Sequence, residues 1–175
     1  MKQLVIGEGL CPFAHPVFDR MPIHVSAESD LERVTHALMD LLQQMAEADS
    51  NELPTALFVS THCLHDFHEY WHWVEICERL LQQMGYEGLL QLATFHPNYV
   101  FAGEDEEDMS HYTNRSPYPM LHIIREADIE QALATIEYPE RIPERNQRHL
   151  RRLGREGLLK VMPSLAKSRV FHEQE

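Results

Sequence analysis

Apolar residues follow two patterns along the chain, short unbroken runs and longer segments with helical spacing. Short apolar runs bounded by Pro, Gly or polar residues are typical of β-strands. Four such runs occur, at residues 23–27, 56–60, 89–95 and 120–125. Between them, apolar positions three and four residues apart predict helices over residues 31–48 and 63–84. Ser29 or Asp30 can cap the first helix, and Thr61 can cap the second.

Two further helices are predicted after the last strand. The first covers residues 128–136, and the second has Pro143 in its first turn and ends at Gly154. The order of elements predicts an α/β protein, with α+β as the alternative class: a single-domain sandwich over residues 1–175, in which helices cover a small four-stranded mixed sheet. The strand-helix-strand start favours parallel pairing of the first two strands, and the sequence does not determine the direction of the fourth.

A segment of 24 residues, 96–119, separates the third and fourth strands and has no periodicity. Structureless loops longer than about 12–15 residues are usually functional or disordered in a compact domain. Aromatic residues and Pro dominate both ends of this loop, and five consecutive acidic residues, 104–108, occupy its middle. We therefore expect ordered ends that carry functional groups at the rim of the sheet, and a mobile middle.

The fourth strand carries two polar side chains among apolar ones. Alternation places Met120, His122 and Ile124 on one face of the strand and Leu121, Ile123 and Arg125 on the other. Because both faces are mostly apolar, His122 and Arg125 need partners inside the protein. Backbone carbonyl groups, or a carboxylate such as Glu126 or Asp66, can satisfy them, and so can a ligand.

Composition excludes several classes of protein. Hydrophobic residues make up 43% of the chain and charged residues 25%, as in soluble globular proteins. No apolar stretch approaches the roughly 18 residues of a membrane span, and the N-terminal apolar run is too short for a signal peptide, so we expect a cytoplasmic protein without membrane association. The three cysteines, Cys11, Cys63 and Cys77, lack paired CxxC spacing, which argues against a disulfide scaffold or a zinc ribbon.

The formal net charge of −13 is unevenly distributed. Residues 1–110 carry 4 basic and 19 acidic groups, whereas residues 111–175 carry 11 basic and 9 acidic groups. Six of the arginines lie between Arg141 and Arg155. The overall acidity argues against general nucleic-acid binding. The Arg-rich segment is expected to form a solvated helix face that pairs with the acidic loop, or a surface for a partner.

Several sequence strings resemble a known family. They are CPFA at 11–14, FHPxYxF at 95–101 and NRSPYP at 114–119, together with Asp66-Phe67 and Arg145-Asn146. They resemble an uncharacterised bacterial family that is classed only as a domain of unknown function, and the resemblance covers nearly the whole chain. It implies a soluble bacterial protein and supplies no reaction. Family members usually carry a longer N-terminal helix, so the resemblance leaves open whether residues 1–10 are the complete N-terminus.

The polar residues in and around these strings suggest a ligand pocket. They are His96, Tyr99, Asn114, Arg115, Ser116, Tyr118, His122, Arg125 and Asn146. Our leading hypothesis is a small enzyme that binds an anionic small molecule there. Arg115 and Arg125 would hold the anion, and His96 or His122 would act as the acid or base. Cys11 is a further candidate, as the nucleophile.

The same residues also have structural interpretations. Arg115 can tie the long loop to the domain, and His122 can be a buried group satisfied internally. Asn146 shares a helix face with apolar residues and can bind loop backbone, and Cys11 can be packed and inert. The runner-up function is therefore a non-catalytic binding or interaction protein that uses the long loop and the Arg-rich helix.

A third hypothesis is a metal or haem protein that uses Cys11 or a histidine-rich helix. His65, His68 and His72 fall on one side of the predicted helix, and His68 and His72 have the i,i+4 spacing that can chelate a transition metal. That side lies opposite the apolar stripe, so we expect a solvated surface rather than a metal site. The sequence identifies no cofactor and no oligomeric state.

Overall fold

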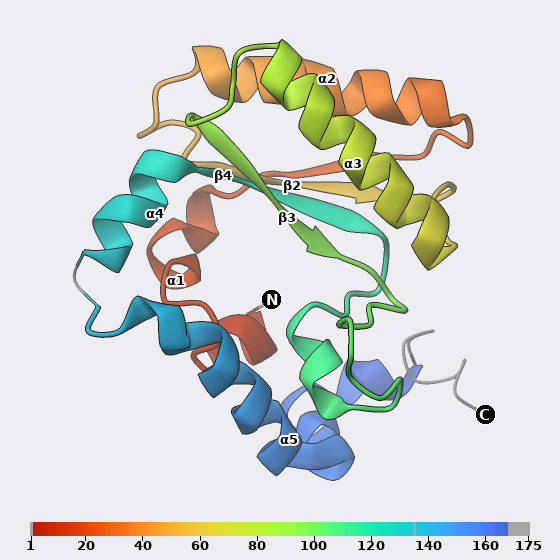
Figure 1. The fold of residues 1–175 in the computed structure, drawn as a ribbon, viewed down its shortest axis with the longest axis vertical. Helices are drawn as coiled ribbons and strands as arrows, with labels where there is room; N and C mark the ends of the chain where they lie inside the picture. Colours follow the sequence, from red (N-terminus) through yellow and green to blue (C-terminus); the bar gives the residue numbers. More distant parts are fainter. Residues whose placement is uncertain (1, 135, 168–175) are drawn as a thin grey trace.

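One four-stranded mixed sheet lies at the centre of the computed structural model, which describes residues 2–134 and 136–167 (Figure 1). Its strands are β1 (Ile23–Ser26), β2 (Thr55–Ser60), β3 (Leu90–Phe95) and β4 (Met120–Arg125). Their order in the sheet is β1-β2-β4-β3; β1 and β2 are parallel, and β4 is antiparallel to both of its neighbours. The expected α/β class and four-stranded mixed sheet are confirmed, and the undetermined strand is antiparallel.

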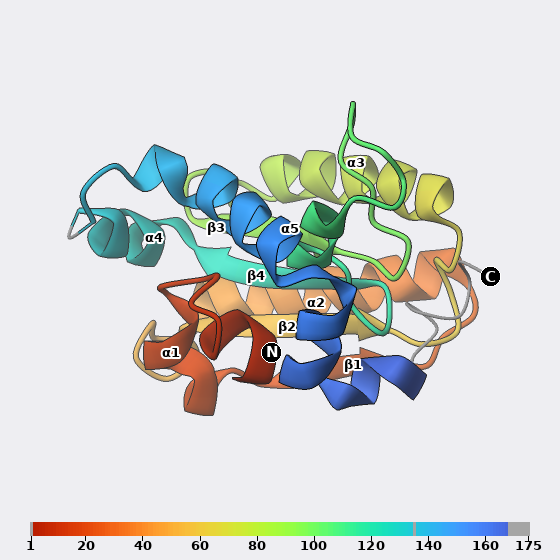
Figure 2. The same cartoon turned by 90° about the horizontal axis from the view of Figure 1, so that it is seen from below.

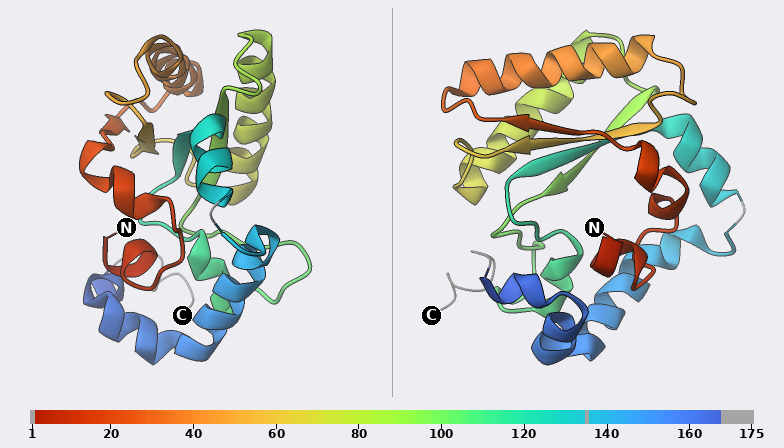
Figure 3. Two further views of the ribbon diagram at one scale, coloured as in Figure 1. Left: turned by 90° about the vertical axis from the view of Figure 1, so that its left-hand side faces the viewer. Right: turned by 180° about the vertical axis from the view of Figure 1, so that it is seen from behind.

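Two long helices, α2 (Leu31–Glu47) and α3 (Phe67–Gln83), cover one face of the sheet (Figures 1 and 3). The Asp30 carboxylate caps α2 by accepting a hydrogen bond from the Arg33 N–H at 3.0 Å. The start of α3 was predicted wrongly. Asp66 caps α3 in place of Thr61, and Leu64, with φ 65°, lies in the left-handed region and interrupts any earlier helical turn.

The main core fills the space between the sheet and these two helices. Its largest fully buried members include Trp73, Tyr70, Leu38, Leu42, Met45, Leu121 and Ile123. Leu121 and Ile123 come from β4, as the alternation along that strand predicts. His122 and Ile124 belong to the opposite face, so the sheet separates the main core from a second layer.

The second face of the sheet is covered by shorter pieces of chain (Figures 1 and 2). Three helical turns precede β1: Lys2–Ile6, α1 (Ala14–Val17) and Phe18–Arg20. None of them was predicted, because turns of three to five residues are too short to show a repeating apolar face. The helix α4 (Glu126–Leu133) follows β4 directly and begins two residues before the predicted start.

The last long helix, α5 (Ile142–Val161), does not end at Gly154 as expected. Gly154 has φ 64° and ψ 176°, which glycine adopts at little cost, and the helix is kinked there and continues. Residues on both sides of the kink contribute to a second apolar cluster with the N-terminal segment. That cluster contains Leu4, Leu10, Tyr112, Leu150, Leu158 and Leu165.

The long loop, residues 96–119, is held against α5 by an ion-pair cluster. Arg151 donates to Glu104 at 2.7 Å and to Asp108 at 2.9 Å, which confirms the expected pairing of the Arg-rich helix with the acidic loop. Partial burial raises the pKa of Asp108, but the hydrogen bonds from Arg151 and Ser110 outweigh it and lower the pKa to about 2. These contacts do not support the expectation of a mobile loop middle.

None of the helices within residues 2–134 and 136–167 is long and apolar enough to cross a membrane.

Arg125, at the end of β4, ties the sheet to the end of α2. Its guanidinium donates to the carbonyl oxygens of Met45 at 2.5 Å, Ala48 at 2.9 Å and Leu53 at 3.1 Å. The last carbonyls of a helix have no partner within the helix, so Arg125 satisfies groups that would otherwise be buried unpaired. The expected internal partners of Arg125 are therefore backbone carbonyls.

We expect Arg125→Met to lower the free energy of unfolding by about 2–4 kcal/mol, because it leaves three carbonyl groups without a donor. Urea denaturation measures the loss. The control is Arg79→Met on the exposed side of α3, which should change stability by less than about 0.5 kcal/mol. An equal, small loss in both variants would show that the Arg125 contacts do not stabilise the fold.

Candidate functional site

His96, at the end of β3, makes hydrogen bonds to backbone through both ring nitrogens. Its Nε2 lies 3.0 Å from the carbonyl oxygen of Leu64, and its Nδ1 lies 3.0 Å from the backbone nitrogen of Asn98. A carbonyl only accepts and an amide N–H only donates, so the neutral ring carries its proton on Nε2. The imidazole is fully buried and holds the loop onto the segment that precedes α3.

The stiff NRSPYP segment also turns its donors toward backbone. Asn114 donates to the carbonyl of Thr94 at 3.0 Å. The Arg115 guanidinium donates to the carbonyls of Tyr99, at 3.1 Å, and Glu106, at 3.0 Å, and its Cζ lies 5.0 Å from the centre of the Tyr112 ring. These contacts match the structural interpretation of Arg115, in which the residue ties the loop to the domain.

The remaining predicted pocket residues are spread over other parts of the molecule. The Ser116 hydroxyl donates to the Tyr118 carbonyl at 2.6 Å, within its own turn, and the Tyr118 side chain is exposed. Asn146, on α5, donates to the Leu10 carbonyl at 2.6 Å, and the neighbouring Arg145 donates to the Gly9 carbonyl at 2.9 Å. The expected single pocket therefore does not form from these residues.

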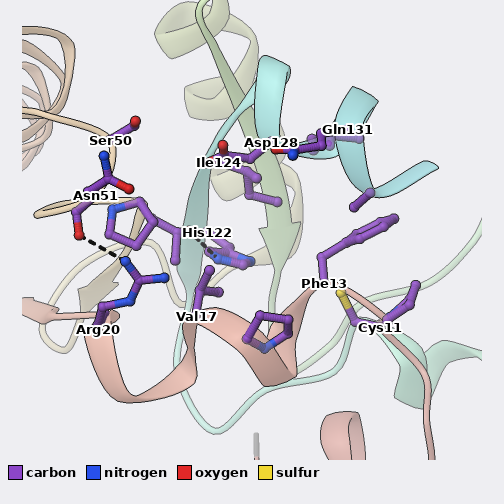
Figure 4. A pocket seen from close by; sticks show the side chains of 16 residues that line it. Cys11, Phe13, Val17, Arg20, Ser50, Asn51, His122, Ile124, Asp128 and Gln131 are labelled. Atoms are coloured by element: carbon purple, nitrogen blue, oxygen red, sulfur yellow. Dashed lines mark hydrogen bonds between the residues drawn. The ribbon is translucent and has the colours of Figure 1, made fainter. Parts of the chain in front are cut away.

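Two of the predicted residues, Cys11 and His122, do share a cavity (Figure 4). It has a volume of about 450 Å³ and lies on the second face of the sheet. Its walls come from the N-terminal segment, the connection between α2 and β2, the start of β2, β4 and α4. Its lining is Cys11, Pro12, Phe13, Pro16, Val17, Arg20, Ser50, Asn51, Pro54, Thr55, His122, Ile124, Asp128, Ile129, Gln131 and Ala132.

The orientation and protonation of His122 follow from its neighbour Thr55. The Thr55 hydroxyl donates to the Ile123 carbonyl at 2.6 Å, and the same oxygen lies 2.6 Å from His122 Nε2. The hydroxyl has only one proton, and it points at the Ile123 carbonyl. The Thr55 oxygen must therefore accept the hydrogen bond from His122 Nε2–H. The neutral ring then has its lone pair on Nδ1. Burial lowers the pKa of His122 to about 4, so the ring is neutral at pH 7.

The second ring nitrogen of His122 makes no hydrogen bond among the residues that the structure describes, unlike those of the other two buried histidines. His96 and His111 each use both nitrogens: His111 Nε2 binds the carbonyl of Asp105, and its Nδ1 accepts from the Phe101 N–H. Within the described part of the chain, His122 Nδ1 has no hydrogen-bond partner, and it is not among the side-chain atoms sealed from solvent. The free lone pair is therefore open to the cavity that the ring lines.

Cys11 lies at the other side of the cavity from Arg20, next to Phe13 (Figure 4). Burial raises the pKa of its thiol, and hydrogen bonds from the backbone N–H groups of Phe13 and Ala14 oppose that rise without cancelling it. The thiol is thus protonated at neutral pH. The histidine that shares this cavity is His122, and the nearby His15 does not line it.

Arg20 and Asp128 bring opposite charges to the cavity, and sequence analysis missed both. Arg20 is exposed and donates to the Asn51 carbonyl at 2.8 Å, which ties the N-terminal segment to the connection before β2 (Figure 4). No sequence signal joins these residues, because Arg20 lies in a short turn before β1 and Asp128 lies far along the chain in α4. Thr55 was the one available clue, since a hydroxyl at the start of a buried strand requires a partner.

The remaining sequence candidates lie elsewhere. Cys77 is buried in the main core as expected, and burial raises its pKa to about 12. His68 and His72 are exposed on α3, and His72 Nδ1 lies 3.7 Å from Glu75. Across residues 2–134 and 136–167, no group of three or more His, Cys, Asp or Glu side chains is placed to hold a metal ion.

A family model described as a protein of unknown function (DUF1415) matches residues 1–160. The chain belongs to this family. The match includes every residue that lines the cavity and the whole of the long loop. No curated protein and no solved structure matches this DUF1415 chain. The resemblance expected from the sequence strings is therefore confirmed at the level of the family, which carries no assigned reaction.

We expect His122 to carry its proton on Nε2 at neutral pH and to titrate near pH 4. Multiple-bond ¹H–¹⁵N NMR distinguishes the two neutral forms of the ring and follows the titration. Because the unfolded chain binds this proton at a higher pH, the free energy of unfolding falls as pH drops from about 6.5 to about 4, by roughly 3 kcal/mol in all. His122→Gln should lose less stability in that window.

His15→Gln is the matched control, since His15 is exposed and lies outside the cavity. It should keep the acid sensitivity of the unsubstituted chain. A proton on Nδ1, or titration near pH 6.5, would contradict the assignment.

Proposed function

We propose that the chain is a small enzyme whose active site is the cavity on the second face of the sheet, with His122 as the general base. The observation that carries the proposal is the free lone pair of His122 Nδ1. His96 and His111 use both ring nitrogens in hydrogen bonds to backbone groups, so neither ring has a nitrogen left to exchange a proton with a ligand. Only a neutral, oriented imidazole with an open nitrogen can take a proton from a bound molecule.

The lining of the cavity indicates what kind of molecule fits. Arg20 lies at one end, Cys11 at the other, and His122 between them (Figure 4). Apolar side chains such as Val17 and Ile124 cover much of the wall. A compact molecule with an apolar body and one acidic group matches this arrangement, because its anionic end can meet the Arg20 guanidinium.

The lowered pKa of His122 supports an acidic ligand. An imidazole with a pKa of about 4 is a weak base at neutral pH. A negative charge placed beside it favours the protonated form and raises its pKa. Binding of an anion would therefore make His122 a stronger base, so that proton transfer depends on the correct ligand. The proposed substrate is still anionic, as expected from the sequence. The residue proposed to bind it is Arg20 and no longer Arg115 or Arg125.

Cys11 is the candidate nucleophile. Its thiol becomes reactive only when a base removes its proton, and His122 is the base in the same cavity. If the thiolate attacks an ester carbonyl, the alcohol leaves with the proton held by His122, and water then releases the acid and regenerates the thiol. A half-ester of a small dicarboxylic acid supplies both the free carboxylate and the scissile bond.

The test combines binding and turnover. Small apolar half-esters should shift the amide NMR signals of Phe13, Val17 and Ile124. Arg20→Leu should weaken binding about tenfold or more, the effect of one charge-assisted hydrogen bond. His122→Gln keeps an amide donor for Thr55 and should retain binding, but it should lower ester turnover by about 10²–10⁴-fold.

Cys11→Ser separates the two roles, because it should abolish turnover if the thiol is the nucleophile and spare it if His122 activates water. Arg79→Leu, far from the cavity, controls for the loss of a positive charge. Binding without turnover in the unsubstituted chain would make this a binding protein. Ligand shifts that map outside the cavity would contradict the proposed site.

A further inference from the structure

A second concave site lies between α3 and the first part of the long loop. We call it the aromatic groove. Its volume is about 850 Å³, and four aromatic rings line it: Phe67 and Trp71 from α3, and Tyr99 and Phe101 from the loop. It shares no lining residue with the cavity that contains His122.

The rings of the aromatic groove meet at steep angles. The Trp71 and Tyr99 rings are 6.3 Å apart with planes at 77°, and the Tyr99 and Phe101 rings are 5.1 Å apart with planes at 66°. Near-perpendicular neighbours form corners rather than a flat stack. Tyr99 is buried and fixed through the Arg115 contact to its carbonyl, whereas 42% of the Trp71 surface remains exposed. The fold thus leaves the Trp71 ring open to solvent beside the half-buried Phe67 and Phe101 rings.

The charge of the groove is negative. Three carboxylates line it, Glu75, Glu104 and Glu106, together with two histidines, His68 and His72, and no lysine or arginine does. Glu104 is paired with Arg151 and Glu75 lies near His72, while the Glu106 side chain is exposed and makes no hydrogen bond or ion pair in the described part of the chain. Negative ring faces beside carboxylates attract cations and repel phosphates.

We propose that the aromatic groove binds a free small organic cation whose ammonium nitrogen carries methyl groups. Such a cation sheds water more easily than a metal ion, so it gains from ring faces that a hydrated ion cannot use. Its methyl groups bury apolar area against the rings, and its charge is balanced by the carboxylates. An uncharged apolar molecule would bury the same apolar area but gain nothing from the Glu106 carboxylate, the one of the three without a partner in the described part of the chain.

The test compares choline with 3,3-dimethylbutan-1-ol, which has the same shape and no charge. Calorimetry and the Trp71 indole N–H signal report binding to the intact chain. We expect choline to bind at least tenfold more tightly than the alcohol, with affinity that falls as salt rises. Equal binding of the two molecules would overturn the proposal. So would the absence of choline binding when choline is in the millimolar range and in 100-fold excess over the protein.

Variants locate the site. Trp71→Ala and Phe101→Ala should each weaken choline binding at least fivefold, and Glu106→Gln should weaken it about threefold. Tyr138→Ala and Glu137→Gln, exposed positions outside the groove, are the matched controls and should have no effect. Unchanged binding in both Trp71→Ala and Phe101→Ala, with the fold confirmed by thermal melting, would overturn the proposal.

The source of the cation is tested separately. A peptide that carries trimethyllysine presents the same ammonium group on a macromolecule. If it binds at least tenfold more tightly than choline, the commitment to a free small molecule is wrong. Similar or weaker binding supports that commitment. Neither result depends on the His122 cavity, so the two proposals can fail independently.

Discussion

The need to pair backbone carbonyl groups outside regular structure governs how this chain folds. Many residues lie in turns and in the long loop, where buried carbonyl groups have no hydrogen-bond donor from a neighbouring strand or helical turn. Side chains from distant positions take that role. Arg125 closes the end of α2, Asn114 and Arg115 fix the loop, and Asn146 holds the N-terminal segment. The polar residues that appear most functional in the sequence are therefore largely occupied by the fold itself.

This explains why the sequence predicted the fold better than the site. The four strands carry short apolar runs and α2 carries a repeating apolar pattern, and their predicted bounds agree with the structure to within one residue at each end. The turns before β1 have no such pattern. A buried arginine or asparagine needs acceptors of the same kind whether a ligand or a backbone carbonyl supplies them. Residue type alone could not distinguish a pocket at Arg115 from a structural contact.

The cavity residues show the other half of the problem. Arg20, Asn51, Thr55 and Asp128 are ordinary residues from three separate segments of the chain, and only the fold brings them together. His122 was recognisable as a polar residue on an apolar strand. Its unpaired Nδ1, however, follows from the Thr55 hydroxyl donating to the Ile123 carbonyl, which the sequence does not reveal. The two concave sites also differ in chemistry. The cavity offers an imidazole, a thiol and charged groups of both signs, whereas the aromatic groove offers rings, carboxylates and two histidines.

The kink at Gly154 has a consequence for the order in which the molecule assembles. It directs the end of α5 back toward the start of the chain, so Leu158 and Leu165 pack with Leu4 and Leu10. Contacts between the two ends of a chain close late, because they require nearly all of it to be present. During synthesis the β1–β4 sheet can pair before α5 emerges, but Leu4 and Leu10 gain most of their apolar partners only after it does. The wall of the cavity that carries Cys11 is therefore completed late, when α5 packs against the start of the chain.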